Sequence, residues 1–149
     1  KICLAAAKTA ELAYGLSGQR KFVDIAKKQY QRALRLGPRN YLVYYHFCQF
    51  YETHPGLDRD FSERLRLLER LVQLFPTNAR YHYLLGNLYL QLAREEGGAY
   101  FQKGEQEFRK AMELNLVVPH IYGVLDSKSI PDQKIIELGL QKLYELRKK

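Results

Sequence analysis

The chain has 149 residues, of which 46% are hydrophobic and 27% are charged. That balance is typical of an ordinary globular domain and excludes wholesale disorder, collagen and a coiled-coil rod. The formal net charge of +8 favours an anionic partner, and residues 1–40 alone carry nine basic and two acidic side chains. The longest uncharged stretch, residues 81–93, is shorter than the roughly 20 residues of a membrane-spanning helix.

Apolar residues at helical spacing predict eight helices, and no segment has the alternation of a strand. Pro38 and Pro76 each end a helix, because proline lacks the N–H group and clashes with the preceding turn. In chain order, the predicted helices are 2–17, 20–36, 40–53, 59–75, 78–94, 100–115, 118–126 and 131–147.

Residues that favour helix N-termini precede several of these segments. Asn40, Thr77 and Asn78 have side chains that can accept from the free N–H groups of a first turn. Segments 60–63 and 129–132 resemble capping boxes, with an acidic residue three positions after the predicted cap.

The sequence contains an internal repeat in three copies. Several sets of similar residues recur in one register, with gaps of 38 and then 40 positions, and each copy contains two helical patterns. Small residues such as Gly86 and Gly104 are expected to let neighbouring helices approach closely. The equivalent positions include Tyr30, Leu68 and Phe108; Ala33, Leu71 and Ala111; and Tyr44, His82 and Tyr122.

These residues resemble the tetratricopeptide repeat (TPR) family. The first-helix pattern of that family is matched by Asn78, Ala79, His82, Leu85, Gly86 and Tyr89. The second-helix pattern is matched by Ala26, Tyr30, Ala33, Leu34 and Pro38, and again by Gly104, Phe108, Ala111 and Met112. The copies are longer than the family's usual length of roughly 34 residues, and Leu116 replaces the closing proline.

The resemblance implies an all-α fold, a right-handed α-solenoid of antiparallel helix pairs. It divides a single domain, 1–149, into repeats at about 6–39, 40–77 and 78–117, followed by a degenerate repeat and capping helix at 118–149. The chain begins Lys-Ile-Cys, which we interpret as a segment of a longer protein.

Catalytic and metal-binding motifs are missing from the sequence. There is no glycine-rich phosphate loop and no His-Glu-x-x-His or Cys-x-x-Cys spacing, so we expect no enzyme, no metal and no cofactor. The four histidines are scattered and are interpreted as packed or hydrogen-bonded. Cys3 and Cys48 are interpreted as small apolar residues, and the alternative is a single disulfide between them.

A concave groove is the first candidate binding site. In the TPR arrangement the first helix of each pair lines this groove, which would present Tyr45, Gln49, Arg80, Tyr83 and Asn87. Tyrosine dominates many binding surfaces, and the amides can hydrogen-bond an extended backbone. The predicted function is a non-enzymatic interaction module that holds a peptide segment of a partner protein. The alternative is that the tyrosines pack against neighbouring helices.

A basic helix face is the second candidate. Its cationic residues step along one side of the predicted helix 20–36 and just beyond it: Lys21, Lys28, Arg32, Arg35 and Arg39. Such a row could contact the phosphates of RNA or another anionic surface. The alternative is a solvated helix face.

Two further alternatives concern context. TPR segments also occur at the soluble ends of bacterial envelope proteins, including those that assemble polysaccharide, and nothing in the sequence selects that interpretation or a compartment. Apolar ends of a stack can also pair into a dimer, for which Ile121, Tyr122 and Leu125 are candidates.

Overall fold

The computed structural model describes residues 1–117 and 133–149, and throughout these ranges all regular secondary structure is helical. The predicted all-α class is therefore confirmed. The chain divides into two compact units, Lys1–Leu57 and Asp58–Lys149, and a single domain over 1–149 stays a prediction. The predicted helix 118–126, with its candidate dimer residues, and the capping box 129–132 lie outside the described residues.

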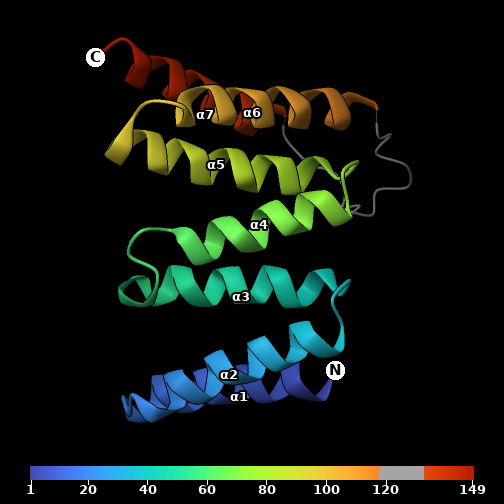
Figure 1. Cartoon of the computed structure of the whole chain (residues 1–149), viewed down its shortest axis with the longest axis vertical. Helices are drawn as coiled ribbons and strands as arrows, with labels where there is room; N and C mark the ends of the chain where they lie inside the picture. Colours follow the sequence, from blue (N-terminus) through green and yellow to red (C-terminus); the bar gives the residue numbers. More distant parts are fainter. Residues whose placement is uncertain (118–132) are drawn as a thin grey trace. The chain divides into compact units, whose positions relative to one another are not determined.

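Unit 1 (Lys1–Leu57) contains three α-helices and a short 3-10 helix (Figure 1). They are α1 (Ile2–Ser17), α2 (Lys21–Leu36), α3 (Tyr41–Thr53) and η1 (Pro55–Leu57). The predicted α-helix bounds in this unit agree with the structure to within a single position at each end.

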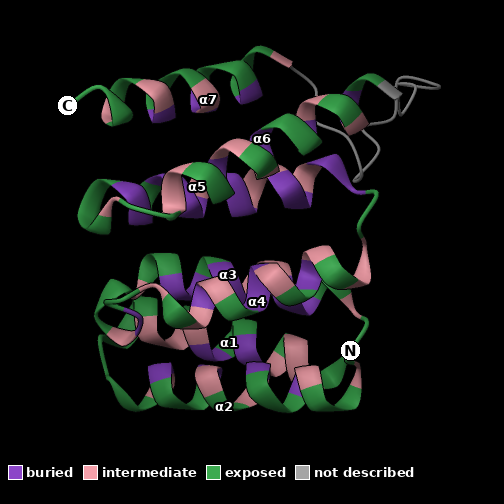
Figure 2. Ribbon diagram, turned by 45° about the horizontal axis from the view of Figure 1, so that its top comes forward, coloured by how far each residue is buried: buried purple, intermediate pink, exposed green. Residues whose placement is uncertain are grey.

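The core of unit 1 is built on aromatic rings between α2 and α3. Tyr30 of α2 stacks on Phe47 of α3 with ring centroids 5.0 Å apart, and Phe47 stacks on Tyr51 at 4.9 Å. Ala7 and Ala10 are the buried residues of α1, and their small size lets α1 lie close to α2. Figure 2 shows the amphipathic pattern of α2, with buried residues on one side and exposed residues on the other.

Unit 2 (Asp58–Lys149) contains four described helices. They are α4 (Ser62–Leu74), α5 (Ala79–Glu96), α6 (Tyr100–Val117) and α7 (Gln133–Arg147). Helix α5 packs on α4 and α6, and α7 packs on both α5 and α6. The predicted C-terminal helix therefore packs on the α5–α6 pair, and its role as the cap of a solenoid stays a prediction.

The N-terminus of α4 differs from the predicted capping box. Asp58 is the principal cap: its carboxylate accepts from the backbone N–H groups of Glu63 (2.8 Å) and Arg64 (3.1 Å), whereas Asp60 accepts from the N–H of Ser62. The Glu63 side chain does not reach back along the chain but pairs with Arg66 at 2.9 Å. Helix α4 consequently begins at Ser62, whereas the sequence predicts a start at position 59.

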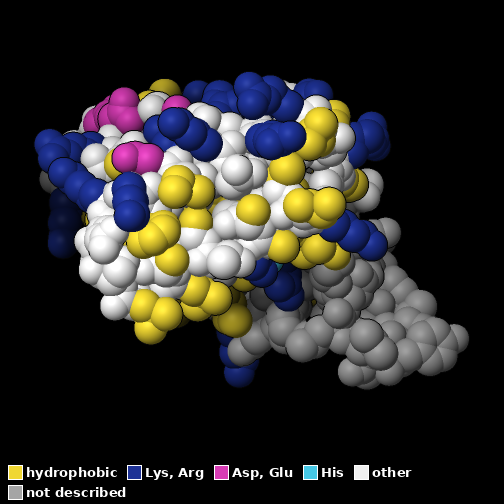
Figure 3. Space-filling view, turned by 90° about the horizontal axis from the view of Figure 1, so that it is seen from below, with side chains coloured by type: hydrophobic (Ala, Val, Ile, Leu, Met, Phe, Trp, Pro, Cys, Tyr) yellow, Lys and Arg dark blue, Asp and Glu magenta, His cyan; other side chains and the backbone are white. Residues whose placement is uncertain are grey.

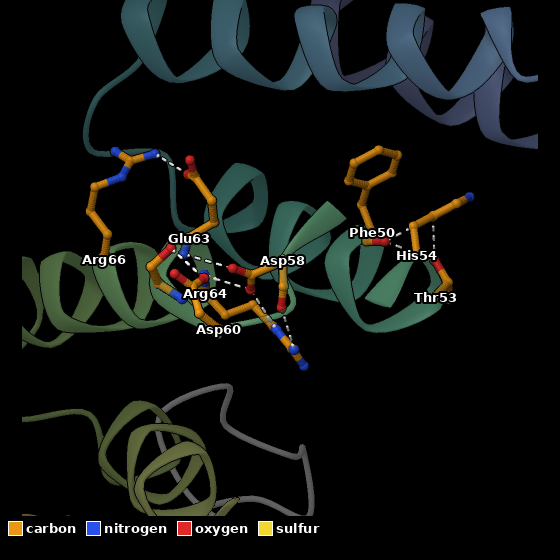
Figure 4. A network of polar contacts seen from close by, with 9 residues as sticks. Phe50, Thr53, His54, Asp58, Asp60, Glu63, Arg64 and Arg66 are labelled. Atoms are coloured by element: carbon orange, nitrogen blue, oxygen red, sulfur yellow. Dashed lines mark hydrogen bonds and ion pairs between the residues drawn. The ribbon is translucent and has the colours of Figure 1, made fainter. Parts of the chain in front are cut away.

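The capping aspartate also forms a buried ion pair. The Arg64 Nε donates to Asp58 Oδ2 at 2.9 Å, and the two residues are only 7% and 2% exposed (Figure 4). The Arg64 guanidinium lies 4.5 Å from the centre of the Phe61 ring. Phe61 has a φ of 60°, a left-handed conformation that is costly for a residue with a side chain. The ion pair and the ring contact together hold this turn.

Two glycines make room for one phenylalanine in the core of unit 2. A Cβ atom at Gly86 of α5 would lie 2.9 Å from the Phe108 ring, and one at Gly139 of α7 would lie 2.7 Å from it. Phe108 itself, on α6, is fully buried. The prediction that Gly86 permits close helix approach is confirmed, and Gly139 of α7 has the same role.

The internal repeat is visible in the helix caps. The Asn40 side chain accepts from the N–H of Leu42 at the start of α3, and the Asn78 side chain accepts from the N–H of Arg80 at the start of α5. The two asparagines also have similar backbone angles, with φ of −82° and −94°. Both predicted asparagine caps are confirmed, whereas Thr77 lies before the cap of α5.

The same junctions share a second polar contact. The Tyr44 hydroxyl donates to the carbonyl of Pro38 at 2.9 Å, and the His82 ring contacts the carbonyl of Pro76 through Nε2 at 2.8 Å. In each case the side chain bonds the proline that ends the preceding helix. The predicted register, which aligns Tyr44 with His82, therefore relates equivalent local structures in the two units, with histidine replacing the tyrosine hydroxyl in unit 2.

His82 makes the stability of unit 2 depend on pH. Its Nδ1 lies 2.6 Å from the Glu107 carboxylate, so both ring nitrogens face acceptors and the doubly protonated ring suits the site. Burial lowers the pKa of His82, but the hydrogen bonds to Glu107 and Pro76 outweigh that effect and the net shift from 6.5 is upward.

A histidine pKa raised by folding stabilises unit 2 fully below about pH 6.5, and this contribution is lost as the pH rises through the folded value. We expect the loss between about pH 6 and 8.5 to be on the order of 1 kcal/mol, as for a charge-assisted hydrogen bond. Urea unfolding across that range measures it. His82→Gln removes the titrating group, and a wild-type curve parallel to that of His82→Gln would contradict the assignment.

Candidate functional site

Unit 1 contains a hollow of about 610 Å³ between α1 and α3. It is lined by five residues of α1, by one residue of α2 and by two residues of α3. These residues are Lys8, Glu11, Leu12, Gly15, Leu16, Tyr30, His46 and Gln49. Because α1 and α3 both pack on α2 but scarcely on each other, the space between them stays open.

The floor of the hollow is a tyrosine–carboxylate pair. The hydroxyl of Tyr30, whose residue is 1% exposed, donates to the carboxylate of Glu11. Burial raises the pKa of Tyr30, and the neighbouring carboxylate raises it further, so the phenol stays neutral and remains a donor. The Glu11 carboxylate is thereby held against the core instead of projecting freely into the hollow.

The α3 side of the hollow is polar. The side-chain amide of Gln49 donates to the Tyr45 hydroxyl at 3.1 Å, and its oxygen lies 3.1 Å from Nδ1 of His46. The Gln49 side chain is exposed, whereas Tyr45 and His46 are half-buried. This network fixes the direction of the amide and leaves it a second N–H for a ligand.

The α1 side of the hollow is apolar and open. Leu12 is 70% exposed and Leu16 is 92% exposed, and both line the hollow. A Cβ atom added at Gly15, between them in sequence, would meet no atom within 4 Å. Lys8 adds a cation on the same edge. The hollow thus offers apolar contact along α1, hydrogen bonding along α3 and one positive charge.

Only part of the predicted groove belongs to this hollow. Gln49 lines it, and Tyr45 is bonded to Gln49, but Arg80, Tyr83 and Asn87 lie on α5 of unit 2, where all three are half-buried. The Tyr83 ring is 6.1 Å from Phe108 and packs against the core of α5, α6 and α7. A groove shared by all five residues stays a prediction.

The sequence interpretation missed the contribution of α1. Leu12, Leu16 and Lys8 were not identified because the alanine-rich segment 2–17 matches the repeat weakly. A signal was nonetheless present: Ala7 and Ala10 fall on one helical face, and Leu12 and Leu16 fall on another. Apolar residues on both faces distinguish this helix from an ordinary amphipathic one.

The predicted basic patch is solvent-exposed. Four of its cations lie on α2 opposite the buried face, and Arg39 follows the helix. Lys21 lies over the Phe22 ring at 5.1 Å, and within the described residues no salt bridge involves the patch. Binding of nucleic acid or another anionic surface by Lys21, Lys28, Arg32, Arg35 and Arg39 stays a prediction.

The described residues offer no cluster of histidine, cysteine and acidic side chains that could hold a metal ion. Cys48 is buried in α3, and Cys3 is half-buried on α1. Among the described helices, none combines the length and hydropathy needed to cross a membrane. No protein-family model matches the chain, and neither does any curated protein.

Proposed function

We propose that the chain is a TPR-like interaction module, a right-handed α-solenoid of antiparallel helix pairs that binds a peptide segment of a partner protein and performs no catalysis. Two features support the repeat architecture. The α2–α3 and α4–α5 junctions have matching caps and matching contacts to a proline carbonyl, at equivalent positions of the repeat. In addition, α7 covers the α5–α6 pair as a terminal capping helix would.

The hollow of unit 1 is the observation that carries the proposed binding function. Leu12 and Leu16 give a bound side chain an apolar wall, and removing these two exposed residues from water would favour association. Opposite them, the oriented Gln49 amide can bond a peptide group of the ligand. A peptide presents both of the features that the hollow can bind, apolar side chains and backbone amides.

Filling the hollow should weaken peptide binding strongly without disturbing the fold. Peptides are first selected on the wild-type chain from a random library, and their affinities are measured by fluorescence anisotropy. Gly15→Trp adds an indole at a position that lines the hollow and is open to an added side chain, and we expect selected peptides to bind at least about tenfold more weakly. Helix content should not fall, because glycine is the less favourable residue inside a helix.

Gly56→Trp is the matched control, because Gly56 lies in η1, outside the hollow, and also has no atom within 4 Å of an added Cβ. It should leave affinity unchanged, whereas Gln49→Ala should weaken binding. Selected peptides that bind Gly15→Trp as tightly as wild type would contradict the proposed site.

A further inference from the structure

Helix α1 is apolar on both faces, although only one face is covered in unit 1. Ala7 and Ala10 face the interior, while Ile2 is 86% exposed, Leu12 70% and Leu16 92%. A helix that is apolar all round is normally buried on all sides, and clustered exposed leucines mark interaction surfaces. Figure 3 shows hydrophobic side chains gathered on the face that α1 and α2 form, with Lys and Arg side chains beside them.

The positive charge around this face indicates which kind of partner can bind it. Unit 1 carries nine basic and three acidic side chains. Lys8 is the exposed charge on α1, Lys1 directly precedes the helix, and the one carboxylate of α1, Glu11, is engaged by the Tyr30 hydroxyl. Two copies meeting through this face would bring like charges together, whereas an acidic partner would be attracted.

We propose that the α1 face binds an amphipathic helix of a partner protein, with an apolar stripe over Leu12 and Leu16 and acidic flanks toward Lys8. This inference rests on the proposed function and specifies its partner. The hollow beside the leucines favours a protein over a lipid surface, because a side chain of the bound helix can enter it, whereas a bilayer contacts only what projects.

The polar wall of the hollow fits the same occupant. Gln49 keeps a free amide N–H for a carboxylate or amide on the flank of the bound helix. The Gln49 side chain is bonded to the Tyr45 hydroxyl and to the His46 ring, each at 3.1 Å, and Gln49 lines the hollow together with the leucines. An acidic flank could therefore be satisfied on both edges, by Lys8 on α1 and by Gln49 on α3.

Two designed peptides test the inference. Each has about 18 residues of alanine-rich helix with leucines at i, i+4 and i+7; one carries Glu on its flanks, and the other carries Lys at the same positions. With the full chain, we expect the Glu peptide to bind at least about tenfold more tightly than the Lys peptide. Its affinity should also fall as salt is raised.

Variants locate the binding. The double variant Leu12→Ser with Leu16→Ser should lower the affinity for the Glu peptide by at least about tenfold. Lys8→Glu should also lower this affinity, and it should reduce the ratio of the affinities for the Glu peptide and the Lys peptide. Leu138→Ser and Lys142→Glu, on exposed positions of α7, are the matched controls. Since all these side chains are exposed, circular dichroism should report an unchanged fold.

Several outcomes would overturn the inference. Equal binding of the two peptides, insensitivity to Leu12→Ser with Leu16→Ser, or concentration-dependent dimerisation abolished by that double variant would each do so. So would binding of vesicles rich in phosphatidylserine that depends on Leu12 and Leu16, in the absence of Glu-peptide binding. If library-selected peptides bind at Gly15 and Gln49 but lack acidic flanks or helical character, the proposed function stands and this inference fails.

Discussion

Replacing Asp58 with alanine is expected to lower the free energy of unfolding of unit 2 by about 3–5 kcal/mol, the range for breaking a buried ion pair. The Arg64 guanidinium would keep its charge in a site where the residue is 7% exposed. At the same time the N–H groups of Glu63 and Arg64 would lose the carboxylate that accepts from both. Urea unfolding followed by circular dichroism measures the change.

Asp60→Ala is the matched control for this prediction. Asp60 is also an aspartate before α4, and its carboxylate also accepts from a backbone N–H, that of Ser62, at 3.2 Å. It is exposed, however, and forms no ion pair in the described part of the chain, so its loss should shift the unfolding curve far less. An Asp60→Ala effect equal to that of Asp58→Ala would show that Asp58 is not the principal cap.

Phe108→Ala is the second change with a large expected effect, again about 3–5 kcal/mol of unfolding free energy. The ring is fully buried and lies against Gly86 of α5 and Gly139 of α7. With glycine at both facing positions, no neighbouring side chain at Gly86 or Gly139 can move in to fill the space. The cavity should therefore stay open and its cost should be near the upper end of that range.

The packing account also predicts a reversal of sign at Gly139. In the wild-type chain, Gly139→Ala places a Cβ atom 2.7 Å from the Phe108 ring and should destabilise unit 2 by about 1–3 kcal/mol. In the Phe108→Ala background the space is free, and the substitution should stabilise by about 1 kcal/mol, because alanine is the better helix former. Additive effects of the two changes would contradict direct contact between these positions.

The helices and their junctions could be predicted from the sequence because their signals are local. Pro38 follows the end of α2, and Pro76 follows the end of α4. Two residues after each proline, Asn40 caps α3 and Asn78 caps α5. The same locality explains why the repeat register could be recognised, since Tyr44 and His82 each bond the carbonyl of a nearby proline.

The cap of α4 could not be predicted in the same way. Asp58 accepts from Glu63 and Arg64 across a turn in which Phe61 adopts a left-handed conformation, and phenylalanine gives no sequence signal for such a turn. A nearer aspartate in a familiar spacing, Asp60, therefore looked like the cap.

The candidate site was predicted only in part for a related reason. Tyr45 and Gln49 lie on a helix whose core stripe is clear, so their exposed face could be assigned from periodicity. Leu12 and Leu16 lie on a helix with apolar residues on both faces, where periodicity does not tell the buried side from the open one. The buried side of α1 is determined by its packing on α2 through Ala7 and Ala10.

Amide chemical-shift mapping tests the central claim most directly. The isotope-labelled full chain is titrated with the tightest library-selected peptide, and its backbone resonances are followed. The account predicts that the largest shifts fall on Lys8, Leu12, Leu16, His46 and Gln49, around the hollow between α1 and α3. Shifts confined to the basic patch of α2 or to α5, with the resonances of the residues around the hollow unchanged, would contradict the account.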